Sequence, residues 1–219
     1  AGKWQRHLVR LGRIDEASRR NQRFNQISQT WRASPPDHFI VGAGITTSAP
    51  AIARFLETIS FLPAGMVVLP DLDMIMPDDE WDLLGPFKAD PDSGAKKRAQ
   101  ETHPQYHMKL LLDRMSIARA EVMRWPRTGE SGAAAKRSKA LSNAFAIPKL
   151  TARWQSLETN ERSLAGVRTL EARNSAEEAQ GVALLAREAL EEPQRRVAIV
   201  TPDRALAARI SAHLERWKI

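Results

Sequence analysis

The sequence predicts an α/β fold with parallel sheets, because buried strands alternate with amphipathic helices in two separate stretches. In the first stretch, an apolar strand at 39–44 runs into a glycine turn, a helix with an apolar stripe follows, and a second strand lies at 66–69. Such a strand-helix-strand unit has parallel strands and a right-handed crossover. The second stretch repeats the pattern, with strands at 167–170 and 196–201 and helices at 176–190 and 203–217.

Composition limits the class of protein. The chain has 219 residues, 42% of them hydrophobic, which is enough for one sizeable core or two small ones. It has no cysteine, which excludes disulfides and thiolate metal sites and favours a cytoplasmic location. No apolar run approaches the roughly 18 residues of a membrane span, and the N-terminus lacks the apolar stretch of a signal peptide, so we expect no membrane partner.

The charge of the chain points to a phosphate-bearing partner. The formal net charge is +7 and the isoelectric point is about 10.1, and Arg contributes more than Lys. Guanidinium groups pair bidentately with phosphates, so nucleic acid is the natural candidate. The alternative is that a coding sequence rich in G and C makes Arg and Ala abundant without any functional reason.

Four segments are expected along the chain. Residues 1–35 form a basic helical segment of two helices interrupted near Gly12, which Pro35-Pro36 ends. The first α/β lobe covers 36–147, a linker 148–165, and the second lobe 166–219. Both ends look cut within regular elements, so we expect an internal piece of a longer protein.

The first lobe carries segments of opposite charge. Residues 71–92 are acidic and rich in proline, which predicts a loop with one turn around Trp81, whereas 93–139 are basic. Further expectations are a helix at 103–115, a strand at 120–125, a mobile basic stretch at 129–139, and a helix at 140–154 broken by Pro148.

Two constellations suggest nucleotide chemistry. Gly42 and Gly44 lie between a strand and a helix, where free N–H groups bind anions, but the motif is neither GxGxxG nor a P-loop, and a simple tight turn is the alternative. Asp71 and Asp73 follow the next strand, where carboxylates can hold Mg²⁺. The alternative is a solvated acidic loop, which includes Asp78, Asp79, Glu80 and Asp82.

Aromatic and histidine residues offer weaker signals. His103 and His107 have the spacing of a zinc pair but no evident third ligand, so a helix start packed on a core is preferred. The six tryptophans are spread among basic residues, as base-stacking platforms are, yet we expect at least four to be core residues.

The order of several segments resembles the alphaproteobacterial form of AddB, the subunit that partners AddA in a helicase-nuclease for double-strand break repair. The resemblance covers nearly the whole chain. The matching segments are AGITTSAPAIARFL (43–56), VVLPDLD (67–73), HPQYHMKLLLDRM (103–115), RAEVMRW (119–125) and VAIVTPDRALAARISAHLERWKI (197–219).

The resemblance implies degenerate RecA-like lobes, of the P-loop NTPase type, with helical insertions. AddB-like subunits resemble helicases that keep the scaffold and lack the motor, so no catalytic residue and no metal ligand is carried over. An active motor has polar groups that contact Mg²⁺ and the γ-phosphate at the positions that Gly42, Gly44 and Asp71 occupy in this chain. Arg204 is the one residue that could contact a nucleotide. No cofactor is expected in this segment, although the parent complex would use ATP, Mg²⁺ and an iron-sulfur cluster.

The function that we expect is a non-catalytic scaffold that binds single-stranded DNA in homologous recombination, with an AddA-like motor as protein partner. The alternatives are a module that docks on AddA through its basic surface, and an ATPase lobe that uses Asp71 or Asp73 with Mg²⁺. The candidate DNA-binding residues are Lys96, Lys97, Arg98, Lys109, Arg114, Lys136 and Arg137.

Overall fold

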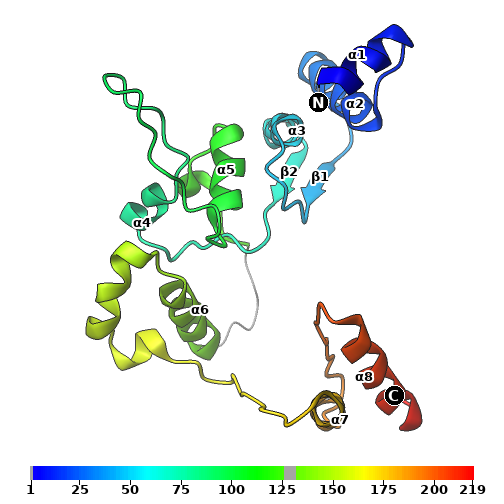
Figure 1. Cartoon of the computed structure of the whole chain (residues 1–219), viewed down its shortest axis with the longest axis vertical. Helices are drawn as coiled ribbons and strands as arrows, with labels where there is room; N and C mark the ends of the chain where they lie inside the picture. Colours follow the sequence, from blue (N-terminus) through cyan, green and yellow to red (C-terminus); the bar gives the residue numbers. More distant parts are fainter. Residues whose placement is uncertain (1, 126–131) are drawn as a thin grey trace. The chain divides into compact units, whose positions relative to one another are not determined.

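The strand-helix-strand unit predicted near the N-terminus is present. In this computed structural model, β1 (Ile40–Ala43) and β2 (Gly65–Val68) form a parallel two-stranded sheet, in a register that pairs Ile40 with Gly65 and Ala43 with Val68. Helix α3 (Pro50–Ser60) connects the strands (Figure 1). The part of the chain that the structure describes, residues 2–125 and 132–219, is helix-rich with this small parallel sheet.

The chain divides after Ala165 into two compact units. The division falls at the residue where the second lobe was expected to begin. Residues 148–165, expected as a linker, instead pack within the first unit. There they form two 3-10 helices, η2 (Pro148–Ser156) and η3 (Thr159–Arg162).

Helix α3 packs closely against the sheet because two glycines leave room for it. A Cβ atom at Gly42 would lie 2.9 Å from Leu56 Cδ2, and one at Gly65 would lie 1.9 Å from the Ile59 carbonyl oxygen. Leu56 and Ile59 belong to the first hydrophobic cluster, to which α5 (Tyr106–Arg114) contributes Met108 and Leu111. The N-cap of α3 is Ala49, so no side-chain hydrogen bond caps its first turn.

The two helices expected before the sheet are also present, as α1 (Gly2–Arg10) and α2 (Glu16–Ala33). Asp15 caps α2 by accepting a hydrogen bond of 2.7 Å from the Ser18 amide. The backbone and hydroxyl of Ser18 donate to this carboxylate, which holds the pKa of Asp15 below its usual value. Phe24 and Trp31 place α2 on α3, with ring centroids 5.0 and 5.4 Å from that of Phe55.

Where the sequence predicted a loop with one turn around Trp81, the acidic stretch contains a short helix, α4 (Asp78–Leu83), and it is not solvated throughout. Glu80 is fully buried, and its carboxylate accepts hydrogen bonds from the Ile147 amide at 2.8 Å and from Arg153 Nη2 at 2.5 Å. Trp81 is buried in a second hydrophobic cluster with Leu84, Leu112 and Ile147. The solvated-loop expectation is therefore wrong for Glu80, while Asp78, Asp79 and Asp82 are exposed.

Four other expectations in the first unit need correction. The helix expected from His103 begins at Tyr106, and the strand expected at 120–125 is absent, because these residues pair with no other strand in the described regions. A 3-10 helix, η1 (Arg119–Glu121), begins this stretch. The expected mobile stretch lies partly outside the described residues, and from Gly132 it forms helix α6 (Gly132–Ala144). The helix expected at 140–154 therefore ends at Ala144, and η2 follows as a separate element.

The second unit has the predicted helices without the predicted strands. Helices α7 (Ser175–Leu190) and α8 (Arg204–Arg216) pack through a cluster centred on Ala179, Ala183 and Ile210. Residues 167–170 and 196–201 are irregular, since neither stretch has a ladder partner among the described residues, and Val200 is 95% exposed. Asp203 caps α8, and Pro202 precedes this cap rather than lying in the first turn.

Within residues 2–125 and 132–219, no helix is both long and apolar enough to cross a membrane.

Replacing Glu80 tests the buried ion pair. We expect Glu80→Ala to lower the free energy of unfolding by about 3 kcal/mol, because it leaves the Arg153 guanidinium and the Ile147 amide without their acceptor. Urea denaturation measures this change. The exposed neighbour provides the control, and Asp79→Ala should stay within about 0.5 kcal/mol of the unmodified protein. Equal effects of the two substitutions would contradict the structural role of Glu80.

The two glycines under α3 should differ in their tolerance of a methyl group. Gly65→Ala should destabilise the protein by about 1–3 kcal/mol, because the new Cβ meets a backbone oxygen that moves only with the helix. Gly42→Ala should cost less, since its new Cβ meets the end of the Leu56 side chain. Urea denaturation of both variants checks the order, and the reverse order would contradict this packing.

Candidate nucleic-acid interface

A protruding hairpin of the first unit carries four exposed basic side chains on its two arms. Residues 84–100 form it, between α4 and α5, and it extends away from both helices (Figure 1). Its base is closed by the Gln100 amide, which donates to the Leu84 carbonyl at 2.9 Å, and an antiparallel bridge joins Ala89 to Lys96 nearer the tip. These backbone contacts hold the two arms together.

An acidic turn forms the tip of the hairpin. Asp90 accepts hydrogen bonds of 2.8 Å from both the amide and the hydroxyl of Ser93. Both donors stabilise the ionised carboxylate, and the backbone amide has the larger effect. They hold the pKa of Asp90 below its usual 3.8. Gly94 follows with φ +67°, a left-handed conformation that glycine adopts without strain.

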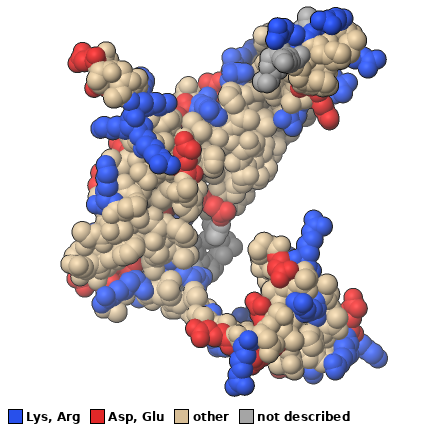
Figure 2. All heavy atoms as spheres, viewed as in Figure 1, with Lys and Arg blue, Asp and Glu red and all other residues tan. Residues whose placement is uncertain are grey.

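Basic side chains follow this turn along the arms. Lys96, Lys97 and Arg98 lie on the returning arm and Lys88 on the outgoing arm, and all four are exposed. In Figure 2, Lys and Arg atoms gather along the hairpin below its acidic tip. The structure thus brings together the first three predicted DNA-binding residues and adds Lys88.

At the base of the hairpin is a pocket of about 380 Å³. Its apolar part consists of Leu83, Phe87 and Ile147. Its polar part consists of Lys97, Arg98, Lys149 and Gln100. None of the three cations is paired with a carboxylate in the described regions, so their charge is available to an anionic ligand. An apolar floor with a cationic rim suits a ligand that is aromatic at one end and phosphorylated at the other.

The remaining predicted DNA-binding residues lie on helices, and most are engaged internally. Lys109 forms an ion pair with Asp113 at 3.4 Å and lies 5.6 Å from the centroid of the Trp81 ring. Arg114 donates to the Ser48 carbonyl, and Arg137 donates to the Ala165 carbonyl at 3.0 Å. The fourth residue, Lys136, is exposed on α6.

The two glycines proposed for nucleotide binding have structural roles in the sheet and its packing. The Gly44 amide donates to the Val68 carbonyl at 3.3 Å, and Gly42 makes room for α3. This N–H group, the kind of donor that an anion would need at the turn, is therefore already used.

The two aspartates after β2 also make structural contacts. The Asp71 carbonyl accepts from Gln105 Nε2 at 2.8 Å, and the Asp73 carboxylate accepts from the amides of Ile75 and Met76 at 2.8 and 2.9 Å. Within the described regions, no group of three or more acidic or histidine side chains is arranged to hold a metal ion. Arg204 is exposed in the first turn of α8, which belongs to the second unit.

His103 has a structural role. Its Nε2 atom lies 2.8 Å from the Phe145 carbonyl oxygen, and its Nδ1 atom accepts a hydrogen bond of 3.1 Å from the Gln105 amide. With Nδ1 accepting, a neutral ring donates through Nε2, so both nitrogens are engaged. This agrees with the preferred interpretation of a packed helix start rather than a zinc pair with His107.

Fewer tryptophans are in the core than the sequence suggested. Trp81 is buried, while Trp31 and Trp217 are half-buried against hydrophobic clusters. The other three, Trp4, Trp125 and Trp154, are exposed. The expectation of at least four core tryptophans is wrong, because helical spacing alone does not show whether a facing partner exists.

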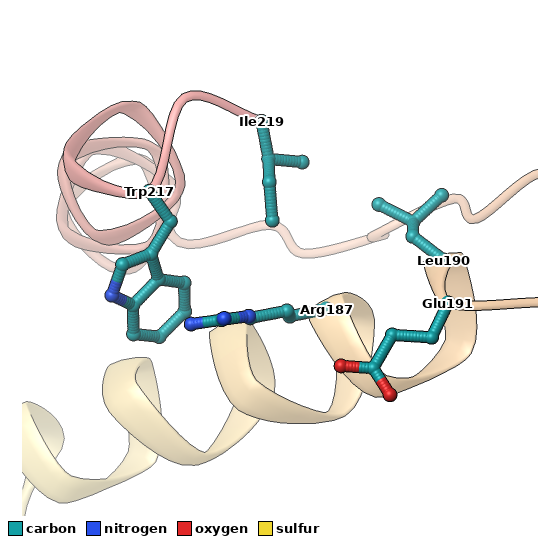
Figure 3. Close-up of a pocket in the computed structure, with 5 residues that line it drawn as sticks. All are labelled: Arg187, Leu190, Glu191, Trp217 and Ile219. Carbon is teal, nitrogen blue, oxygen red and sulfur yellow. The ribbon is translucent and has the colours of Figure 1, made fainter.

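The second unit has an open pocket of about 400 Å³ (Figure 3). The Arg187 guanidinium lies 5.4 Å from the centroid of the Trp217 ring, and Leu190, Glu191 and Ile219 complete the lining. One cation, already engaged by an aromatic ring and accompanied by a carboxylate, gives weaker recognition of phosphate than three cations. The hairpin pocket is therefore the stronger candidate site.

Sequence reasoning did not single out four residues of this interface: Phe87, Lys88, Gln100 and Lys149. The available signal was the FK pair within an otherwise acidic loop, close to the KKR run. Lys149 lies 52 positions beyond Lys97 in the chain, so no local pattern links them.

Comparison with known proteins identifies no relative: no family model, no curated protein and no solved structure matches the chain significantly.

Removing the Ser93 hydroxyl tests the hairpin tip. We expect Ser93→Ala to raise the pKa of Asp90 toward 3.8, since one donor to the carboxylate is lost and the amide donor stays. Because the folded-state pKa is lowered, the contribution of Asp90 to stability is present above pH 3.8 and is lost as the pH falls through the folded-state value. Carboxyl NMR titration measures the shift. Ser156→Ala is the control and should leave the pKa of Asp90 unchanged. An equal shift in both variants would contradict the role of the Ser93 hydroxyl as a donor to Asp90.

Proposed function

We propose that this chain is a non-catalytic scaffold that binds single-stranded DNA, in a subunit of the AddB type that acts in double-strand break repair in the cytoplasm. In this proposal the two units are degenerate RecA-like lobes, and an AddA-like partner supplies the ATP-driven movement. The segments quoted above for the AddB resemblance, which are spread between residues 43 and 219, support the family. The observed α/β unit with its parallel strands is compatible with such a lobe.

The hairpin pocket is the observation that carries the DNA-binding part of the proposal. The pocket is lined by three cations without carboxylate partners in the described regions: Lys97, Arg98 and Lys149. The aromatic side chain of Phe87 lines the same pocket. Single-stranded nucleic acid is bound by this combination, in which cations follow the backbone and aromatic side chains stack on bases. Double-stranded DNA hides its bases within the stack and suits such a pocket less well.

The alternative of an ATPase lobe has less support. The sequence contains no Walker lysine motif, and the Gly44 amide and the Asp73 carboxylate are engaged in the fold.

The alternative of a module that docks on AddA was expected to use the basic surface, whereas the observation in the second unit that suits a protein contact is apolar. Val197, Ile199 and Val200 are exposed in an irregular stretch, and consecutive exposed apolar side chains are typical of protein contact sites. Retained binding to an AddA-like subunit, without salt-sensitive binding to single strands, would favour docking.

Salt dependence of binding tests the proposed function. Fluorescence anisotropy of a labelled single-stranded oligonucleotide should show binding at low salt that weakens as salt rises, with no ATP hydrolysis in the same sample. Each phosphate contact contributes about 0.7 to the slope of log affinity against log salt, so Lys97→Ala/Arg98→Ala/Lys149→Ala should reduce the slope by about 2.

A triple variant of α8 provides the matched control, since its arginines are exposed and outside the hairpin: Arg204→Ala/Arg209→Ala/Arg216→Ala. It removes the same number of charges and should change the slope less. Absence of binding at low salt would overturn the proposal, and equal losses in both triple variants would overturn the assignment to the hairpin pocket.

A further inference from the structure

We infer that the hairpin pocket takes one unstacked nucleotide of a single strand, with the base on its apolar floor and the adjoining phosphate on its cationic rim. This inference rests on the proposed function and makes it specific: the pocket distinguishes a strand with bases from a bare sugar-phosphate backbone. Electrostatic attraction alone would not make this distinction.

The size and shape of the pocket fit a ligand of this class. Its volume of about 380 Å³ is within the range of about 300–1,000 Å³ that is usual for small-molecule sites. Three parts of the first unit form its walls: Leu83 at the end of α4, the base of the hairpin, and Ile147 with Lys149 at the start of η2. Two hydrogen bonds hold two of these walls: the Gln100 amide donates to the Leu84 carbonyl, and the Ile147 amide donates to the Glu80 carboxylate.

The floor of the pocket suits a base. Phe87 is its one aromatic side chain, is half-exposed, and is flanked by Leu83 and Ile147. The Phe87 ring lies close to the backbone of Gly85, because a Cβ atom at Gly85 would be 3.1 Å from Phe87 Cε2. Stacking of a base on an aromatic side chain typically strengthens binding about tenfold or more.

The rim of the pocket suits a phosphate and a base edge. Lys97, Arg98 and Lys149 have no carboxylate partner among the described residues, so a phosphate would not have to displace one. The Gln100 side-chain amide supplies both a donor and an acceptor, which are the groups that a base presents on its edge.

The surroundings favour a strand over a free nucleotide. The positive charge continues beyond the pocket along the arms of the hairpin, through Lys96 and Lys88, where neighbouring phosphates of a strand would lie. A free triphosphate would instead require a glycine-rich loop with a lysine, or carboxylates that hold Mg²⁺. Neither arrangement surrounds this pocket in the described part of the chain.

The test compares two oligomers of equal length, oligothymidylate and an abasic strand, by anisotropy at one low salt concentration. Phe87→Leu keeps an apolar side chain and removes the ring, so it should weaken binding of oligothymidylate about tenfold and change binding of the abasic strand less than about twofold. Phe87→Tyr keeps the ring and should restore the preference for bases. Phe61→Leu, at a phenylalanine that is 74% exposed at the end of α3, is the control and should leave both affinities unchanged.

The outcomes separate the inference from the proposed function. Salt-sensitive binding that is equal for both oligomers, and that Phe87→Leu leaves unchanged, would overturn the nucleotide pocket while the scaffold proposal stands. Failure of the unmodified chain to bind either oligomer would overturn both. Displacement of oligothymidylate by ATP, with ATP affinity also lowered in Phe87→Leu, would show a free-nucleotide site and overturn the assignment to a strand.

Discussion

The buried carboxylate of Glu80 determines the position of much of the first unit around the candidate site. A fully buried charge is stable only where donors and an opposite charge surround it, and here the Ile147 amide and the Arg153 guanidinium provide them. The ion pair joins α4 to η2, which lies about seventy residues later in the sequence. Because Ile147 and Lys149 line the hairpin pocket, this one carboxylate also positions one of its walls.

Two hydrophobic clusters in the first unit have different roles. The first joins α3, α5 and the sheet, and it depends on the absence of side chains at Gly42 and Gly65. The second lies under α4 and contains Ile147, so it is the cluster that supports the pocket. Leu69, Leu72 and Ile117 pack against both clusters and connect them. The candidate interface therefore lies on a packed hydrophobic base, although most of its cations are on the exposed arms of the hairpin.

Local patterns predicted the elements that depend on local contacts. The strand-helix-strand unit and the paired helices around Gly12 follow from apolar spacing and from turn residues. The strands expected at 120–125, 167–170 and 196–201 have similar spacing but require a ladder partner, and the described chain supplies none. The expectation of degenerate RecA-like lobes with an AddA-like partner goes beyond these contacts and stays a prediction. Similarly, Glu80 stands in a run with Asp78 and Asp79, and only the distant Arg153 distinguishes it from these exposed neighbours.

Because the hairpin projects beyond the hydrophobic core, its exposed residues can be substituted with little effect on the fold. Lys88, Lys96, Lys97 and Arg98 have little part in the hydrophobic clusters, so replacing them should barely alter the free energy of unfolding. Most mutations elsewhere in a marginally stable domain are constrained by folding. On these arms, substitutions can add or remove positive charge one residue at a time with little effect on the fold.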